Sequence, residues 1–264
     1  MAYSGPSYSL TQEQIRQKRT ERFCENKQVA GSRTVEIDGE LPSAAPTRPP
    51  AHSMAVSGQR LGRDPRHLLQ DTAAWQFYLD YLASKLSADI SEVAVYLGLE
   101  TAKFDEIKNR CKSNRHEMCF NILWAWYMRT VKNEDRLKEI KYALKESNRV
   151  DLSDELTEGN FPLQENFRFD GEINNSQNKL SGSDAIKVSK QLPLTFQRLA
   201  RYFGLDENNI QRVCADNTGD VQEQSYRTID LCIQQQKLTN RRQLCDGLVY
   251  IEQYTTISDL QKNW

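Results

Sequence analysis

The strongest constraint on the fold of this chain is a series of short amphipathic helical patterns between Ser91 and Leu156. Apolar residues recur there at helical spacing, and tight breaks rather than long loops separate one pattern from the next. The middle segment, C-F-N-I-L-W-A-W-Y-M, carries apolar residues on two sides. A helix of this kind is central in a bundle because it packs against several neighbours. The sequence therefore predicts an all-α fold.

The composition narrows the class of protein. A chain of 264 residues has room for two small domains and tails. A hydrophobic content of 38% is low for one packed unit of this size, so part of the chain is expected to stay unpacked. A net charge of −1 and a pI of about 6.4 give no overall attraction to nucleic acid or to anionic membranes. No apolar run approaches the roughly 18–20 residues of a membrane span, and the N-terminus has no apolar signal-peptide core.

The first 70 residues predict a mostly disordered arm. The stretch Ser32–Pro65 contains T-R-P-P, several Ser and Gly, and almost no bulky apolar residues to bury. The stretch Leu10–Lys27 has good helix formers but few apolar anchors. It is interpreted as a solvated charged segment, with a helix that forms on contact with a partner as the alternative.

Residues 71–156 predict a first domain of six helices. Its expected core follows from apolar residues spaced three and four apart, with Gly98 as the left-handed residue after a helix end. The predicted core residues are Trp75, Leu79, Leu82, Leu97, Ile107, Ile122, Leu123, Trp126, Leu137, Ile140 and Leu144.

The pattern returns after an offset of 106 residues. Y-L-G-L-E at Tyr96–Glu100 corresponds to Y-F-G-L-D at Tyr202–Asp206, and at the same offset Trp126 corresponds to Cys232. Agreement over several helices and breaks indicates two copies of one fold. The second domain is predicted at residues 184–264, with a core of Phe196, Leu199, Phe203, Ile210, Tyr226, Ile229, Ile233 and Leu248.

Residues 157–183 are predicted to be a linker because they are rich in Asn, Gly and acidic residues. The linker contains three phenylalanines, Phe161, Phe167 and Phe169. They either pack onto a neighbouring domain or form a short binding motif, and the sequence leaves both open.

The cysteine and histidine residues and the sequence motifs of this chain do not indicate a catalytic site. Six cysteines are spread singly, which suits thiols in a reducing compartment, and the chain is predicted to be cytoplasmic. Cys111, His116 and Cys119 lack a fourth metal ligand, and Cys119 faces the core by periodicity. No phosphate-binding glycine loop, H-E-x-x-H or G-x-S-x-G motif occurs. No enzyme activity, metal or cofactor is therefore expected.

Three segments of the first domain resemble the death domain of the death-fold superfamily. They are L-G-L-E-T-A-K-F-D-E-I, the L-W-A-W centre of the fourth helix, and A-L-K-E-S-N-R-V-D-L-S-D-E-L. The second copy, with R-L-A-R-Y-F-G-L-D-E-N-N-I, is similar to a more divergent death domain in which Cys232 replaces the fourth-helix tryptophan. The resemblance implies two six-helix antiparallel bundles in tandem. It also implies a non-enzymatic adaptor that assembles complexes in apoptotic or innate immune signalling.

The implied partners are other death-domain proteins, namely receptor tails, adaptors, kinases or caspase-linked adaptors, together with possible self-assembly. Candidate contact residues are the charged ones: a basic corner and fifth helix in the first domain (Lys108, Arg110, Lys112, Arg115, Lys138, Lys141) and acidic positions in the second (Asp206, Glu207, Asp216, Asp220, Glu223). The alternative is ordinary solvated surface. Two other functions stay open: a helical nucleic-acid binder that uses the basic patch, and an inhibitory death-fold protein that binds without nucleating assembly.

Overall fold

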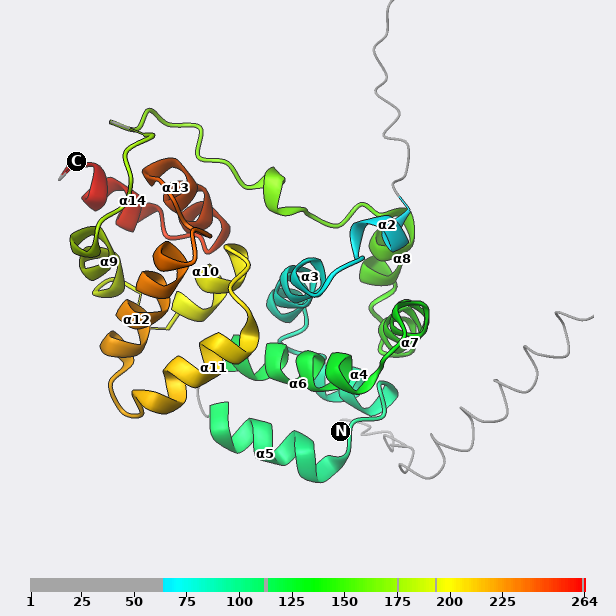
Figure 1. Cartoon of the computed structure of the whole chain (residues 1–264). Helices are drawn as coiled ribbons and strands as arrows, with labels where there is room; N and C mark the ends of the chain where they lie inside the picture. The colour runs from blue at the N-terminus through cyan, green and yellow to red at the C-terminus, as the bar shows by residue number, and fades with distance from the viewer. Residues whose placement is uncertain (1–63, 112–113, 175, 193, 263) are drawn as a thin grey trace, which may run out of the picture. The chain divides into compact units, whose positions relative to one another are not determined.

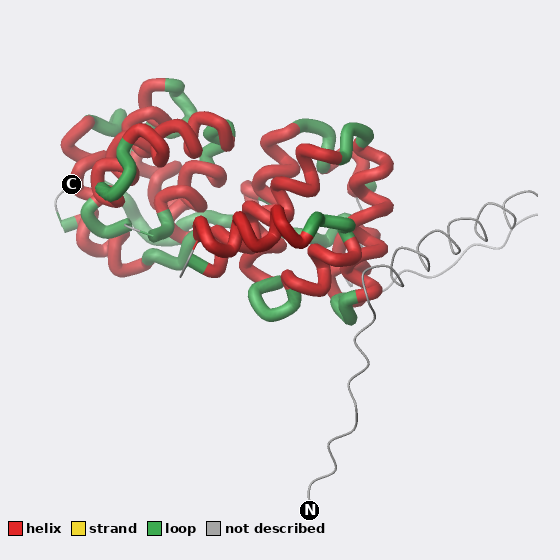
Figure 2. Tube along the Cα trace, turned by 90° about the horizontal axis from the view of Figure 1, so that it is seen from below, coloured by secondary structure: helices red, strands yellow, loops and turns green. Residues whose placement is uncertain are grey.

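The computed structural model describes residues 64–264, except 112–113, 175, 193 and 263. Within this part of the chain there are thirteen α-helices and one short 3-10 helix, and no strand forms (Figure 2). One isolated antiparallel bridge pairs Lys179 with Asn240. The predicted all-α class is confirmed. The predicted N-terminal arm, including Leu10–Lys27, lies outside the described residues except for its last few positions.

The first bundle is formed by one short helix and six longer ones. They are α2 (Pro65–Leu68), α3 (Thr72–Lys85), α4 (Ile90–Tyr96), α5 (Thr101–Cys111), α6 (Arg115–Arg129), α7 (Asn133–Glu146) and α8 (Val150–Glu158) (Figure 1). Helix α2 lies within the stretch that the sequence assigned to the arm. It forms because Pro65 occupies its first turn and the Asp64 carboxylate accepts a hydrogen bond from the Arg66 amide.

The second bundle has six helices. They are α9 (Gly182–Ser189), α10 (Phe196–Tyr202), α11 (Glu207–Asp216), α12 (Val221–Gln234), α13 (Arg241–Tyr250) and α14 (Tyr254–Gln261). Residues 159–181, called the strap below, connect the two bundles and include the 3-10 helix η1 (Gln164–Asn166). The strap is slightly shorter than the predicted linker because α8 continues to Glu158 and α9 begins at Gly182.

The core of the first bundle lies between α3 and α6. The indoles of Trp75 and Trp126 make an edge-to-face contact with 6.2 Å between ring centroids. Both indole N–H groups are satisfied, since Trp75 donates to Asn133 Oδ1 and Trp126 donates to Glu139 Oε2. All eleven side chains assigned to this core from the sequence are buried.

The core of the second bundle includes most, but not all, of the residues that the sequence assigned to it. Six of its eight assigned residues are buried, whereas Tyr226 and Ile233 are only partly buried at its edge. Both lie on α12, where Ile229 and Cys232 take the inward positions. The predicted helical spacing is correct, but fewer of the apolar residues on α12 face the core than the pattern suggested.

Helix α4 of the first bundle and helix α10 of the second are followed by the same kind of glycine turn. Gly98 after α4 and Gly204 after α10 have φ values of 71° and 72°. In both bundles the next residue, Leu99 or Leu205, donates its amide to a carbonyl five residues earlier, at 2.9 and 3.0 Å. This closure requires a left-handed residue, which glycine adopts without steric cost.

The strap packs against both bundles. Phe161 and Leu163 contact the first core, while Phe167 and Phe169 contact the second. The side-chain amide of Gln164 donates to the Tyr202 carbonyl at 2.7 Å. Of the two roles left open for the phenylalanines, the structure shows packing onto the bundles.

Candidate functional site

The joint between the two bundles is centred on Arg201 of α10, whose side chain is completely buried. Its guanidinium donates to Glu207 on its own bundle at 2.9 Å, and to Glu117 and Asp80 of the first bundle at 2.6 and 3.2 Å. It also lies over the ring of Phe120, 3.4 Å from the ring centroid. One arginine thus connects three carboxylates from three other helices.

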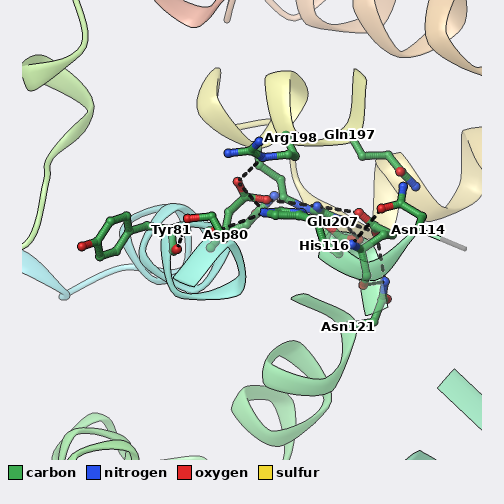
Figure 3. Close-up of polar contacts among 12 residues, drawn as sticks. Asp80, Tyr81, Asn114, His116, Asn121, Gln197, Arg198 and Glu207 are labelled. Carbon is green, nitrogen blue, oxygen red and sulfur yellow. Dashed lines mark hydrogen bonds and ion pairs between the residues drawn. The ribbon is translucent and has the colours of Figure 1, made fainter. Parts of the chain in front are cut away.

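Asp80 at the middle of α3 is the second centre of the joint (Figure 3). Its carboxylate accepts hydrogen bonds from the Tyr250 hydroxyl at 2.6 Å and from Arg198 Nε at 3.4 Å. His116 Nε2 lies 3.1 Å from the Asp80 backbone oxygen. A carbonyl oxygen can only accept, so this ring nitrogen carries the proton. Side chains from helices α6, α10 and α13 therefore all converge on Asp80.

Burial and neighbouring charges oppose each other at these groups. Burial tends to raise the pKa of Asp80, but His116, Arg201 and Arg198 outweigh it and hold that pKa below its ordinary value. Burial raises the pKa of Glu207, and Arg201 only partly offsets this. Burial also lowers the pKa of His116 against the opposing influence of Asp80. Burial therefore disfavours protonation of His116, whereas the neighbouring cationic side chains favour the ionised form of Asp80.

Contacts outside the charged centre complete the joint. The Gln76 side chain donates to the Leu205 carbonyl at 2.8 Å. Phe77 projects from α3 into the aromatic cluster of the second bundle, with its ring centroid 5.1 Å from that of Tyr250 and 6.1 Å from that of Tyr202. The joint thus combines a buried ionic centre with one aromatic ring that crosses between the bundles.

Two hollows flank the joint. One, of about 430 Å³, is lined by polar groups that include Lys85, His116 and Arg198. The other, of about 280 Å³, is lined mainly by apolar residues such as Phe77 and Phe161.

The basic candidates of the first bundle lie at the ends of its helices. Lys108 and Arg110 are exposed in the last turn of α5, where positive charge also complements the helix dipole. Arg115 is exposed at the start of α6 and donates to the Ser87 carbonyl at 2.7 Å. Lys112 lies outside the described residues.

Lys138 and Lys141 lie apart from this corner, on α7. Together with α2 and the end of α8, they line a hollow of about 600 Å³. Partial burial lowers the pKa of Lys141. The five described basic candidates therefore belong to two separate surfaces.

The acidic candidates of the second bundle differ more among themselves. Glu207 is 1% exposed and paired with Arg201, so its assignment to a partner-binding surface is corrected: in the closed chain it belongs to the joint. Asp206 and Asp220 are exposed but cap α11 and α12 by accepting backbone amide hydrogen bonds. Asp216 is exposed, and Glu223 pairs with Arg227 at 2.6 Å.

Sequence reasoning missed the residues that make the joint, above all Arg201 and Asp80. A usable signal was present, because each is a charge among apolar residues: Asp80 is the one charge in F-Y-L-D-Y-L, and Arg201 is followed and preceded by apolar residues in L-A-R-Y-F. A charge in the apolar stripe of a helix needs a buried counter-charge. The sequence gives no indication of which distant residue supplies it.

In the described part of the chain, no metal-binding cluster, no membrane-spanning helix and no disulfide is found. No group of three or more His, Cys, Asp or Glu side chains there is arranged to hold a metal ion. None of the described helices is both long enough and apolar enough to span a membrane. The five cysteines in this part of the chain are free.

The described part of the chain is all-helical, and a buried ionic joint links its two bundles. The sequence model of the death domain family matches residues 76–159, which is about a third of the chain. The match supports a death domain at residues 76–159, which include most of the first bundle. No curated protein and no solved structure matches the chain. Death domains are protein-protein interaction modules whose partners are other death-fold domains, and they are typically not enzymes.

Proposed function

We propose that this protein is a non-enzymatic adaptor that assembles signalling complexes through contacts between death domains, in apoptotic or innate immune signalling. The observation that supports this proposal most is that the bundle matched by the death domain model packs on a second six-helix bundle. In both bundles, charged residues at the ends of helices remain exposed. Such an arrangement presents two different surfaces from one chain. The partners would be receptor tails, other adaptors, kinases or caspase-linked adaptors with death domains.

The second bundle is proposed to be a divergent death fold. Three features support this: the same order of six helices, the shared glycine closure at Gly98 and Gly204, and a second shared closure after the fifth helix. At that closure Asn148 and Glu252 both have a φ of 61°, and the residue after each donates its amide to a leucine carbonyl at 2.8 Å.

Two surfaces of opposite charge would select the partners. The basic corner of the first bundle presents Lys108 and Arg110, and the second presents Asp216 and Asp220. Complementary charge favours specific pairing and fast association more than it adds affinity. We place this adaptor in the cytoplasm, where the five free cysteines of the described residues would stay reduced.

The test is a charge reversal at the basic corner. The double variant Lys108→Glu and Arg110→Glu is expected to keep its helical circular dichroism spectrum while capture of death-domain partners falls at least tenfold. The matched control is Lys190→Glu and Lys262→Glu, which changes the net charge equally at exposed positions of the second bundle. Unchanged capture by the Lys108 and Arg110 variant in pull-down or sedimentation would refute the proposed surface.

A further inference from the structure

The joint is built differently from the cores on either side of it. Each bundle closes around its own apolar cluster, and Phe77 is the first-bundle residue that belongs to the second cluster. Between the clusters lie Arg201 and its carboxylates, whose burial costs desolvation energy. Two faces that never part would be held as well or better by packed apolar side chains. Buried charges instead suit faces that also exist separately in water, where they stay hydrated and guide specific pairing.

The two faces are complementary and unlike. The carboxylate face, on α3 and α6, contributes Asp80 and Glu117. The arginine face, on α10 and α13, contributes Arg201, Arg198 and Tyr250. An interface between unlike faces is heterologous, so it can join the two halves of one chain or one chain to the next.

The arginine face is organised before it meets its partner. Glu207, on the same bundle, accepts from Arg201 Nε and Nη2 at 2.9 and 3.1 Å. Gln211 in turn donates to Glu207 at 2.6 Å. The guanidinium is therefore held with its remaining donors toward the first bundle, which lowers the entropy lost on binding.

The strap makes the contact intramolecular. Its spanning part is residues 162–166, between Phe161 in the first core and Phe167 against the second. Hollows of about 430 and 280 Å³ lie at the edges of the joint. Because the strap is attached to both cores, the closed arrangement depends on the tether as well as on the faces themselves.

We propose that the arginine face of one copy binds the carboxylate face of a second copy of this chain, and that the observed joint is the closed, intramolecular form of this contact. Two copies can exchange faces reciprocally, or successive copies can form an open chain. An intact strap keeps the two faces of one copy at an effective concentration on the order of mM. At micromolar concentration the closed monomer therefore prevails. This inference is separate from the proposed function, since it concerns faces that are buried in the closed chain rather than the exposed corners.

The first test shortens the strap. Deletion of residues 162–166 makes Phe161 and Phe167 consecutive, with their Cα atoms about 3.8 Å apart, so the closed joint cannot form with both rings in place. Wild-type chain of 30.5 kDa is expected to sediment as a monomer, and the shortened chain as a dimer or larger species at the same micromolar concentration. A shortened chain that stays monomeric up to about 100-fold higher concentration overturns the proposal.

Matched variants show which face carries the association. Arg201→Glu in the shortened chain is expected to return it to the monomer. Arg212→Glu, an equal change at an exposed position of α11, is expected to leave the dimer intact. Equal loss or equal retention of the dimer in both variants overturns the assignment to the joint.

A second test keeps the strap intact and does not depend on the deletion folding. Arg201→Glu and Glu117→Lys each break the joint in their own chain, and each is first checked for helical circular dichroism. Mixed in equal amounts, they restore the native pairing between copies, because the first retains Glu117 and the second retains Arg201. The expected result is a 1:1 complex in the mixture, with monomers in each separate sample. A mixture that sediments as the sum of its components overturns the proposal.

Discussion

The two bundles follow the same succession of helices and turns but fill their cores differently. In the first, Trp126 is completely buried against Trp75, and at the corresponding position of the second Cys232 is buried at 1% exposure. The family model matches the first bundle and not the second. The comparison teaches that two bundles can share the same turn geometry without sharing the large aromatic residue at this core position.

The second bundle obtains part of its aromatic packing from outside its own helices. Its Tyr202 and Tyr250 stack with 5.2 Å between centroids, and both are met by Phe77 from α3. Phe167 from the strap makes an edge-to-face contact with Tyr250 at 4.9 Å. The first bundle is therefore closer to a self-contained unit, while the second depends on the joint.

Truncation at the matched core position tests this contrast most strongly. Trp126→Ala is expected to cost about 3–5 kcal/mol of unfolding free energy, because it removes a completely buried indole and leaves a cavity. Cys232→Ala removes one heavy atom and is expected to cost about 1 kcal/mol. Urea denaturation followed by circular dichroism measures both. Equal losses would show that the two cores depend equally on this position.

Removal of the joint's central cation should separate the bundles. Arg201→Ala leaves Asp80 and Glu117 without their buried partner, which typically costs about 3–5 kcal/mol. The lower end, about 3 kcal/mol, is expected because the bundles can part and let water reach the carboxylates. One cooperative thermal transition should become two, and proteolysis within the strap should accelerate.

The control for this prediction is Arg212→Ala, which removes an exposed arginine on α11. It is expected to leave a single transition within about 0.5 kcal/mol of wild type. If Arg201→Ala also unfolds in one transition at an unchanged midpoint, the ionic centre does not couple the bundles.

Periodicity was enough to predict the longer helices and most of the core, since residues such as Leu123 and Trp126 follow the spacing of 3.6. The joint escaped prediction for a physical reason. Arg201 and Asp80 are 121 residues apart, and no local pattern links a buried charge to its distant partner. Glu207 was misassigned because it adjoins the exposed cap Asp206, yet the first turn of α11 directs it inward. Charge signs can be read from a sequence, whereas the burial of a charge depends on the tertiary contact.

The shared closures of the two bundles should respond alike. Gly98→Ala and Gly204→Ala each place a side chain on a residue with a φ near 70°, and each is expected to cost about 1–2 kcal/mol. At Gly204 the nearest atom to an added Cβ is Lys237 Nζ at 4.0 Å, so the cost there is conformational and not steric. Thermal unfolding of the two variants should give similar losses. A loss at only one of them would mean that the closures differ in their structural role.

The smallest expected effect is a pH dependence of the unfolding free energy that arises from the titration of His116 in the joint. Burial lowers the pKa of its imidazole in the folded chain, whereas the unfolded chain binds the proton near the ordinary value of about 6.5. As pH falls below that value, the unfolded state takes up the proton first, so stability decreases with falling pH. His116→Gln retains a hydrogen-bond donor toward the Asp80 carbonyl but does not titrate. The difference in unfolding free energy between wild type and this variant should be constant above pH 7. Between pH 7 and 5.5 the wild type should lose stability relative to the variant. Asp80 and Glu207 titrate in both chains, so a flat difference across this range would exclude His116 as the source.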